Sequence, residues 1–368
     1  MGEFPFQGHK ICERRDIMME KQKRMVLLDW LKAGSILCII INHTDLLGRG
    51  IPANYMLNCL VVAMAVPVFM IISGYNMANS YIVNGRDAGG GYSIASLKRQ
   101  ILRIIPSYTL IYFMEMGFLF LNGQLQNLDW KYFIIFYIIG GKGPGGYYVP
   151  IMIQLFLVMP FLVSFICKCP AKGLFFVFTA NLLFELLVKS VPFHPEIYRL
   201  FIGRYLFLLA MGVFLRTIRG KKLSVRYLSG SLFIGILYIF ITNYFRLTDP
   251  AGAYSWSLFK YWQMTAFPVA FYLFPFMYLL LEKLSGVQVK TWFGSIMQKI
   301  GSRTWYIYGV QMFYFLIVYE VYGVKYDLQK IPLLCEFFVS FFLCISGGFM
   351  LYHFENWVRR ILAAHLKR

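Results

Sequence analysis

Charged residues are scarce in this sequence of 368 residues. Asp, Glu, Lys and Arg make up 14% of the chain, whereas 59% is hydrophobic and 19% is aromatic. A soluble domain carries roughly 25% charged residues, so this chain has too little polar surface to cover a water-soluble globule. Glycine and proline are present in ordinary numbers, 31 and 14, which excludes collagen-like and Pro/Gly-rich disordered chains. A membrane protein is the class that remains.

Cysteine is also sparse, and its spacing is not that of a site. Four of the seven Cys residues lie inside apolar runs, where a thiol behaves as a small hydrophobic group: Cys38, Cys59, Cys335 and Cys344. The sequence contains no CxxC motif and no Cys/His cluster. We therefore predict no metal site, no required disulfide and no permanently bound cofactor.

Acidic residues are few, with 17 Asp and Glu against 36 Lys and Arg. A protein that binds nucleic acid gathers its basic residues on one soluble face. Here the basic residues are spread over short connections between apolar runs, which is the distribution that sets membrane topology. The sequence therefore argues against a nucleic-acid partner and favours the lipid bilayer.

Long apolar runs predict an all-α, polytopic membrane protein. A helix needs about 20 residues to cross about 30 Å of hydrocarbon, and this measure predicts about ten transmembrane helices. They lie at about 25–45, 56–83, 101–121, 145–167, 173–190, 197–216, 226–245, 257–282, 303–322 and 332–354. The aromatic segment 132–139 is too short to span, so we interpret it as a re-entrant or interfacial helix, with a broken span as the alternative.

The basic residues predict the orientation of the chain. With both termini in the cytoplasm, most of the 36 Lys and Arg residues fall on the cytoplasmic side, as the positive-inside rule requires. We therefore predict a cytoplasmic N-terminal tail over 1–24, a transmembrane domain over 25–354 and a cytoplasmic C-terminal tail over 355–368. The first apolar run contains Asp29 and Lys32 and lacks a cleavage motif, so we expect an uncleaved span of a cell-membrane protein.

The first span holds ionisable residues, which are costly inside a bilayer unless they face a cavity or a partner. These residues are Asp29, Lys32 and His43, and Asp45 lies just beyond them. Lys32 and His43 are eleven positions apart, so they share one helix face about 16 Å apart. Asp29 and Lys32 either snorkel to the headgroups or take part in function. His43 is either a helix contact or a general base that works near neutral pH.

The second span, with the sequence VPVFMIISGYNMA, carries polar groups near its predicted cytoplasmic end. Pro67 and Gly74 are expected to break the regularity of this helix. Ser73 and Tyr75 lie beside Gly74. The segment either presents these polar groups to a ligand or is a kinked packing helix with small-residue contacts.

The third span begins with the basic sequence SLKRQILRIIPSY. Arg103 lies one helical turn after Arg99, just ahead of Pro106. Two guanidinium groups at this spacing suit a clamp for a phosphorylated ligand. The alternative is that they only anchor the helix by the positive-inside rule.

A glycine-rich segment, GGKGPGG, precedes Tyr147, Tyr148 and Gln154. Irregular backbone near membrane depth is tolerated where it lines a cavity, so these three side chains either line a cavity or belong to a surface loop. Four further polar residues lie in or next to spans: Glu115, Glu185, Gln311 and Glu355. The two glutamates within spans are either protonated or paired, and the last two residues face either a cavity or the headgroups.

Several motifs together resemble those of the acyltransferase-3 family, bacterial integral-membrane enzymes that modify cell-surface sugars. DWLKAGSILCIIINH resembles the first-span motif of that family, with Lys32 and His43 at its basic and histidine positions. VPVFMIISGY resembles its second-span motif, and KRQILRIIP, with Arg103 and Pro106, its arginine motif. Weaker similarities are GYYVPIMIQLFLVMP, IGSRTWYIYGVQ and HFENWVRR, the last with Glu355.

The resemblance implies transfer of an acyl group, acetyl in the first place, from cytoplasmic acyl-CoA to a hydroxyl of an extracytoplasmic or lipid-linked saccharide. It implies that His43 takes the proton of the hydroxyl, or alternatively carries the acyl group itself. The implied site residues are His43 and Lys32 for catalysis, Arg99, Arg103, Ser73 and Tyr75 for the acyl-CoA co-substrate, and Asp45, Tyr147, Tyr148 and Gln311 for the substrate.

This sequence departs from the family pattern at three places. Lys32 stands where Arg is commoner, Tyr147 and Tyr148 stand where many members have Trp, and Gln311 stands where many have His. The last two departures leave the choice of substrate open. The membrane halves of serine racemases linked to vancomycin resistance are also similar, but their chemistry resides in a soluble domain, which we do not expect here.

A transporter or flippase for a small polar solute or glycan is the alternative function. Its support is the set of intramembrane charges, which would form an ion relay: Asp29, Lys32, Glu115 and Glu185. The sequence shows no inverted repeat with paired broken helices, which many transporters have.

Overall fold

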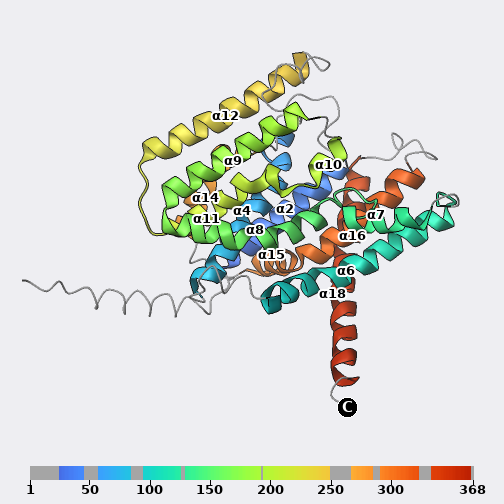
Figure 1. The fold of residues 1–368 in the computed structure, drawn as a ribbon. Helices are drawn as coiled ribbons and strands as arrows, with labels where there is room; N and C mark the ends of the chain where they lie inside the picture. Colours follow the sequence, from blue (N-terminus) through green and yellow to red (C-terminus); the bar gives the residue numbers. More distant parts are fainter. Residues whose placement is uncertain are drawn as a thin grey trace, which may run out of the picture.

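The computed structural model describes residues 25–44, 57–83, 94–125, 129–191, 194–248, 267–284, 291–322 and 333–365, and these contain helices but no strand. In chain order the elements are α2 (Val26–His43), η1 (Val62–Met64), α4 (Ala65–Val83), α6 (Ile94–Leu121), α7 (Trp130–Ile139), α8 (Tyr148–Lys168), α9 (Pro170–Ser190), α10 (Pro195–Arg199), η2 (Ile202–Tyr205), α11 (Leu206–Thr217), α12 (Val225–Thr248), α14 (Val269–Leu284), α15 (Trp292–Ser302), α16 (Thr304–Ile317), η3 (Val318–Tyr322) and α18 (Leu333–His365) (Figure 1).

Seven helices in the described part of the chain are long and apolar enough to cross a membrane. They correspond to seven of the predicted spans: Val26–His43, Leu57–Val83, Ala95–Leu121, Tyr148–Lys168, Pro170–Ser190, Val225–Thr242 and Leu334–Leu362. The chain is therefore a multi-pass, all-helical membrane protein, as its apolar runs predicted.

The other three predicted spans do not form long continuous helices. The 197–216 span is divided into α10, η2 and α11, and α11 has 12 residues. The 303–322 span consists of α16, with 14 residues, and the π-helical turn η3. The described part of the 257–282 span holds α14, with 16 residues. Hydropathy detects apolar runs but not breaks within them, so the count of ten and the orientation remain predictions.

Helix α4 packs most extensively against α11, with two glycines where the helices cross. A Cβ atom on Gly74 would lie 2.1 Å from the Leu209 carbonyl oxygen, and one on Gly212 would lie 2.0 Å from the Ile71 carbonyl oxygen. The small-residue packing expected for this helix is therefore present. The expected break is not, because α4 continues through Gly74 and Pro67 lies in its first turn, where no helical N–H is needed.

Helix α7 lies against α6 and ends in the glycine-rich turn. The Tyr108 hydroxyl donates to the Tyr137 carbonyl oxygen at 2.5 Å, and the Tyr112 hydroxyl donates to the Phe133 carbonyl oxygen at 2.5 Å. The helix has ten residues, too few to cross a bilayer. It stops at Gly140, whose φ of 105° is open to glycine and costly for other residues.

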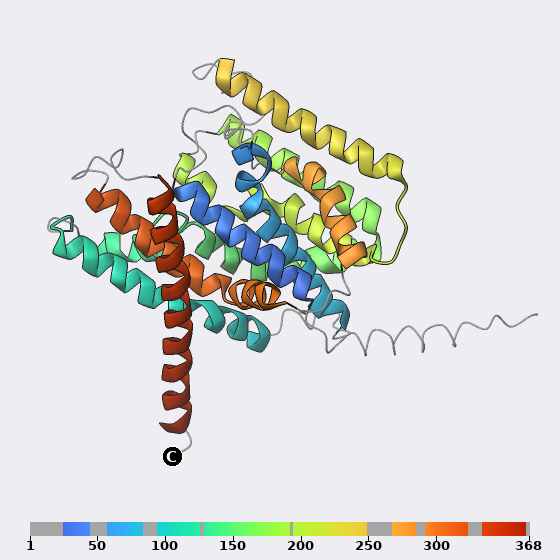
Figure 2. The ribbon, with the colours of Figure 1, turned by 180° about the vertical axis from the view of Figure 1, so that it is seen from behind.

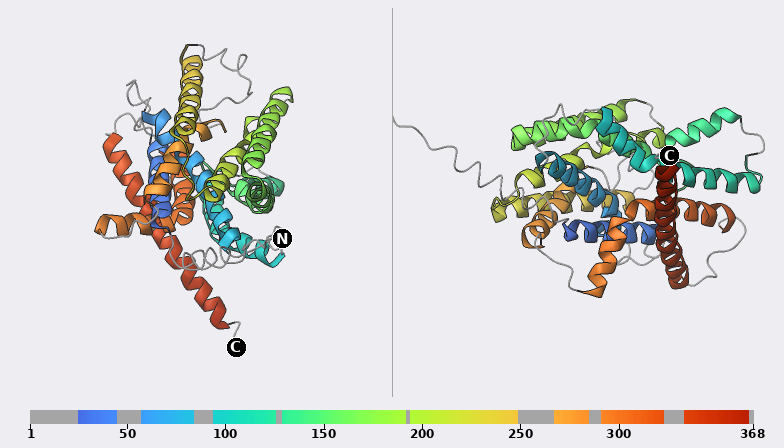
Figure 3. Two further views of the ribbon diagram at one scale, coloured as in Figure 1. Left: turned by 90° about the vertical axis from the view of Figure 1, so that its left-hand side faces the viewer. Right: turned by 90° about the horizontal axis from the view of Figure 1, so that it is seen from below.

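Helix α18 has 33 residues and crosses the other helices before it projects from the body (Figures 1, 2 and 3). At 1.5 Å per residue it is about 50 Å long, well beyond the hydrocarbon thickness. The predicted start of a C-terminal tail at residue 355 therefore falls inside a helix. Residues 1–24 and 366–368 lie outside the described residues. Helix α12, which packs against α14, forms one edge of the bundle (Figure 3).

Candidate functional site

His43 lies in the last turn of α2 and contacts the end of α16 and the turn η3. Its half-buried ring rests on Phe315, with ring centroids 5.1 Å apart. Its Nδ1 atom lies 3.1 Å from the Tyr319 hydroxyl oxygen, and this hydroxyl donates to the carbonyl oxygen of His43 at 3.0 Å. The end of α2 is thus held through a residue 276 positions later in the chain.

These two contacts limit which ring nitrogen can carry the proton. The Tyr319 hydroxyl has one proton and faces both the carbonyl oxygen and the Nδ1 atom of His43. When that proton goes to the carbonyl oxygen, the Nδ1–H group donates to the hydroxyl oxygen, and Nε2 of the neutral ring is unprotonated. When it goes to Nδ1, the ring proton is on Nε2. The first arrangement is the one in which His43 can accept a proton at Nε2.

Lys32 lies at the other end of α2, where it forms a salt bridge of 3.4 Å with Asp29. The Asp29 side chain is 2% exposed and that of Lys32 is 23% exposed, so Asp29 is a buried residue and does not snorkel to the headgroups. Helix α15 packs against this end of α2, since the Trp30 Nε1–H donates to the Gly294 carbonyl oxygen at 3.0 Å. The pair therefore belongs to the α2–α15 contact at the predicted cytoplasmic end.

Arginines from three elements gather near the start of α6. The Tyr306 hydroxyl lies within electrostatic reach of Arg103, Arg359 and Glu355. The Arg303 guanidinium, at the α15–α16 junction, lies 4.5 Å from the ring centroid of Tyr352. Arg103 is exposed, as is Arg99 one turn earlier on α6. Exposed guanidinium groups at this spacing match what binding of phosphate groups requires.

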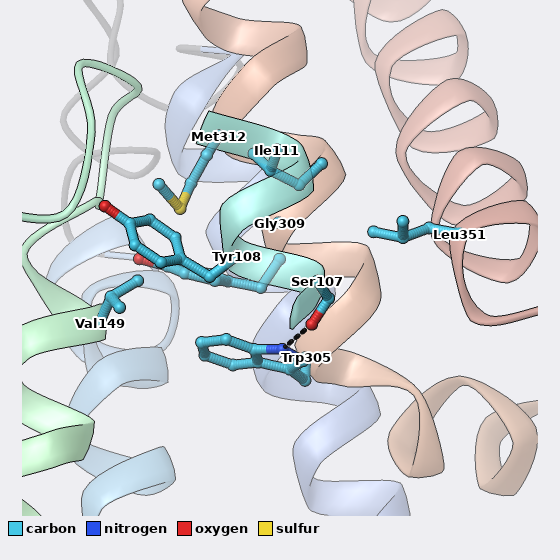
Figure 4. A pocket seen from close by; sticks show the side chains of 9 residues that line it. Ser107, Tyr108, Ile111, Val149, Trp305, Gly309, Met312 and Leu351 are labelled. Atoms are coloured by element: carbon cyan, nitrogen blue, oxygen red, sulfur yellow. Dashed lines mark hydrogen bonds between the residues drawn. The ribbon is translucent and has the colours of Figure 1, made fainter. Parts of the chain in front are cut away.

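A cavity begins beside this arginine cluster and follows α6 and α16 (Figure 4). It is narrow and partly open, with room for about one water molecule, and is lined by Ser107, Tyr108, Ile111, Val149, Trp305, Tyr308, Gly309, Met312 and Leu351. Trp305 donates to the Ser107 hydroxyl at 2.8 Å at one end, and Met312 lies at the other. Ser107 is one helical turn beyond Arg103. Its apolar walls suit a flexible, uncharged chain, and His43 is not among the lining residues.

The glycine-rich turn between α7 and α8 lies against this cavity wall and is held by Glu115. The Glu115 side chain is buried, and its Oε2 atom accepts from the Lys142 N–H at 3.0 Å. A Cβ atom on Gly143 would lie 2.6 Å from the Met312 carbonyl oxygen. The Tyr308 hydroxyl donates to the Gly145 carbonyl oxygen. The turn therefore packs inside the protein, and Glu115 is paired with its backbone.

Tyr147 and Tyr148 follow this turn, and both are half-buried. The Tyr148 ring centroid lies 5.3 Å from that of Tyr308, and its hydroxyl lies close to Ser73. Tyr147 lies close to Tyr205. Neither Tyr147 nor Tyr148 is among the residues that line the cavity beside Ser107, so the interpretation that they face a cavity stays a prediction.

Arg204 is a buried charge that the sequence interpretation overlooked. It lies in η2, is 4% exposed and has its guanidinium 5.1 Å from the ring centroid of Tyr198 and 4.7 Å from that of Tyr205. Glu185, also buried, accepts from the Tyr198 hydroxyl at 2.8 Å. The sequence signal was an arginine inside the apolar run FIGRYLFLLAMGVFL, which hydropathy alone does not separate from a loop charge.

Two amides satisfy the backbone where the 197–216 segment breaks. Gln154 donates to the Leu200 carbonyl oxygen at 2.6 Å and accepts from the Ile202 N–H at 3.1 Å. Asn181 accepts from the Phe207 N–H at 2.9 Å, at the start of α11. Irregular backbone in a membrane protein persists where its polar groups are satisfied internally. Gln154 thus has a structural partner and does not line the cavity.

The remaining predicted site residues are dispersed. Tyr75 is 1% exposed, and its hydroxyl donates to the Met25 sulfur at 3.7 Å, so it lies in the core between α4 and the start of α2. Ser73 contacts Tyr148, as described. Gln311 is fully buried on α16, and neither of its amide atoms has a hydrogen-bond partner within the described residues. Asp45 lies outside the described residues.

Comparison with known proteins gave one result that covers nearly the whole chain. A family model described as an acyltransferase domain matches residues 26–353. The match begins where α2 begins and takes in His43, Arg103 and Gln311, whereas Glu355 and Arg359 lie beyond it. Curated proteins and solved structures gave no match.

Proposed function

Because the chain belongs to the acyltransferase-3 family of acyltransferase domains, we propose that it is an O-acyltransferase of the cell membrane. The acyl group, acetyl in the first place, comes from cytoplasmic acyl-CoA and goes to a hydroxyl of an extracytoplasmic or lipid-linked saccharide. The observation that supports this function is the contact of His43 Nδ1 with the Tyr319 hydroxyl, because a neutral imidazole that donates from Nδ1 presents Nε2 as a proton acceptor. Oxygen nucleophiles of this class need such a base near neutral pH.

Donor binding is proposed at the opposite end of the bundle. Arg99 and Arg103 are exposed on successive turns of α6 and would pair with the phosphates of CoA. The cavity beside Ser107 and Trp305 would widen to receive the uncharged arm. The cavity lining stops at Met312, three residues before Phe315, on which the His43 ring rests. For the thioester to reach His43, the arm must therefore separate the Phe315 side chain from the His43 ring.

The proposed step is a direct transfer. The acceptor O–H proton moves to Nε2 of His43 while the hydroxyl oxygen forms a bond with the thioester carbonyl carbon. The carbon–sulfur bond then breaks, and the imidazolium returns the proton to the departing sulfur, which gives CoA and the ester. Lys32, paired with Asp29 at the far end of α2, is too distant along the helix to touch the same atom, so its proposed contribution is positive charge near the donor.

The ion relay of a transporter receives no support from the contacts. Asp29 pairs with Lys32, Glu115 with the backbone of the glycine-rich turn, and Glu185 with Tyr198. These partners lie in three separate places: within α2 for Asp29, in the turn before α8 for Glu115, and in α10 for Glu185. A continuous relay would need these groups to contact one another.

The test is acyl transfer by purified protein in lipid nanodiscs with radiolabelled acetyl-CoA and a set of methyl glycosides as probe acceptors. We expect release of CoA thiol and label in the glycoside, with both lost in His43→Ala. His353→Ala, which removes an exposed histidine from α18, is the matched control and should retain activity. Transfer by His43→Ala at the wild-type rate would remove His43 as the base. Label that stays on the protein without an acceptor would replace direct transfer by a histidyl intermediate.

A further inference from the structure

Pro106 leaves a gap in the hydrogen bonding of α6. In an α-helix each carbonyl oxygen accepts from the N–H four residues later, and proline has no N–H. Pro106 lies inside α6, so the carbonyl oxygen of Leu102 has no helical donor. Leu102 is the residue just before Arg103, so the local geometry at this carbonyl also directs the Arg103 side chain.

A guanidinium from α18 occupies this gap. The Nη2 group of Arg359 donates to the Leu102 carbonyl oxygen at 3.3 Å, across 257 positions of sequence. Arg359 also donates from Nε to Glu355 Oε1 at 2.8 Å and makes a second bond to the same oxygen through Nη2. Glu355 is 6% exposed and one turn earlier on the same helix. It therefore holds the guanidinium in the direction of α6.

The contacts of Arg359 with Glu355 and Leu102 indicate that the arginines of this cluster have two different roles. Arg359, whose side chain is 48% exposed, has its charge paired with the buried Glu355 carboxylate, and its Nε and Nη2 groups bond to Glu355 and Leu102. Arg99 and Arg103 are exposed on α6, and their guanidinium groups point to solvent-accessible surface where an anion can reach them. Arg99 and Arg103 are thus available to bind phosphate, whereas Arg359 of the same cluster holds α6.

We propose that Arg359, oriented by Glu355, is a positioning residue that holds the part of α6 before Pro106 and thereby places Arg99 and Arg103 for the donor. This inference rests on the proposed function, because it concerns the same donor site. It gives the end of α18, which the sequence interpretation treated as a tail, a part in substrate binding. No contact between Arg359 and the substrate is involved.

A double-mutant cycle tests the hydrogen bond from Arg359 to the Leu102 carbonyl oxygen, which links α18 to α6 and is called the clamp below. Arg359→Met should raise the KM for acetyl-CoA about tenfold, the loss expected for a charged hydrogen bond, with kcat close to wild type. Pro106→Ala restores a backbone N–H to the Leu102 carbonyl oxygen, which replaces Arg359 as its donor, so it should also raise KM. Arg359→Met in the Pro106→Ala background should add little, because its acceptor is then already satisfied. Effects of Arg359→Met that are equal in both backgrounds would overturn the proposal.

Matched variants keep the result interpretable. Arg360→Met removes the neighbouring exposed arginine and should leave KM unchanged; a rise equal to that of Arg359→Met would reduce the effect to net charge and overturn the proposal. Arg359→Lys retains charge but not the forked geometry and should restore only part of the KM. If Arg359→Met does not fold, this variant carries the cycle in its place.

A second measurement separates the clamp from the proposed function. Wild-type protein that neither binds nor turns over acetyl-CoA would contradict the proposed function alone. Wild type, Arg359→Met, Pro106→Ala and the variant with both substitutions would then be compared by thermal unfolding in detergent. The clamp is supported if Arg359→Met lowers the unfolding temperature less in the Pro106→Ala background than in wild type. Equal losses in the two backgrounds contradict it.

Discussion

At the scale of residues, individual hydrogen bonds affect the protonation state and orientation of the polar side chains. His43 shows this most directly, because the Tyr319 hydroxyl contacts both its carbonyl oxygen and its Nδ1 atom. When the Tyr319 proton goes to the carbonyl oxygen, the neutral imidazole donates from Nδ1 and its Nε2 is unprotonated. A histidine at the end of a span would otherwise be free to present either nitrogen. The functional state of His43 is therefore a property of the pair with Tyr319.

Tyr319→Phe tests this pair. The variant removes the acceptor for Nδ1–H and should lower kcat for acyl transfer about five- to tenfold, with little change in the KM for acetyl-CoA, because the donor site is at the other end of the bundle. Steady-state kinetics with acetyl-CoA is the measurement. Tyr314→Phe removes a hydroxyl that faces Ser340 on α18 and serves as the control. Equal values of kcat in wild type and Tyr319→Phe would contradict the tautomer assignment.

Buried charge follows the same principle at other residues. Asp29, Glu115 and Glu185 each receive donors from a neighbouring group, as residues inside a membrane protein must. The sequence indicated that these charges needed partners. It could not name them, because Lys142 and Tyr198 are brought close by the turn between α7 and α8 and by the break before α11.

At the scale of elements, the cavity depends on how α6, α8, α16 and α18 meet. Its walls come from side chains spaced three and four residues apart on α6 and α16, and Gly309 leaves room between them. A Cβ atom at Gly309 would lie 3.3 Å from a side-chain carbon of Ile111. A side chain at this position would enter the cavity against Ile111.

Gly309→Leu is therefore expected to block the donor arm. The KM for acetyl-CoA should rise by about tenfold or more, as added methylenes do in an apolar pocket, while the protein still folds. Gly117→Leu on α6, where a Cβ atom meets no atom within 4 Å, is the matched control. Equilibrium binding of CoA to both variants provides the measurement. Unchanged binding in Gly309→Leu would show that the donor arm does not use this cavity.

Across the whole molecule, the proposed chemistry depends on the separation of two ends of one bundle. The arginines lie at the start of α6, and the His43 imidazole lies at the end of α2, which packs against α16. The close crossing of α4 and α11 forms the core beside them, together with α8 and α14. Without water to drive association inside a bilayer, such contact depends on small residues that let helices approach.

Gly212→Ala tests this dependence. The new Cβ atom would lie 2.0 Å from the Ile71 carbonyl oxygen, which forces backbone apart and should cost about 1–3 kcal/mol. Thermal unfolding in detergent should show a clear loss for this variant. Gly230→Ala on α12, whose Cβ atom meets no atom within 4 Å, should match or exceed wild-type stability. Equal unfolding temperatures for the two variants would contradict the packing argument.

The membrane class and the family could be predicted from residue order, because apolar runs and short motifs are local properties. Seven of the predicted spans are long apolar helices, and the family match extends over 26–353. Pro106 and the basic residues before it were likewise visible in the sequence. These features need no knowledge of which helices touch.

Tertiary contacts decided the rest, because they join positions far apart in the chain. Packing placed Tyr75 in the core, buried Arg204 at a break in an apolar run, and tied Gln154 to backbone. It also brought Tyr319 to His43 and Arg359 to the carbonyl oxygen of Leu102. Hydropathy measures how apolar a segment is, and hydrogen bonds between helices depend on orientation, which emerges only when the helices pack.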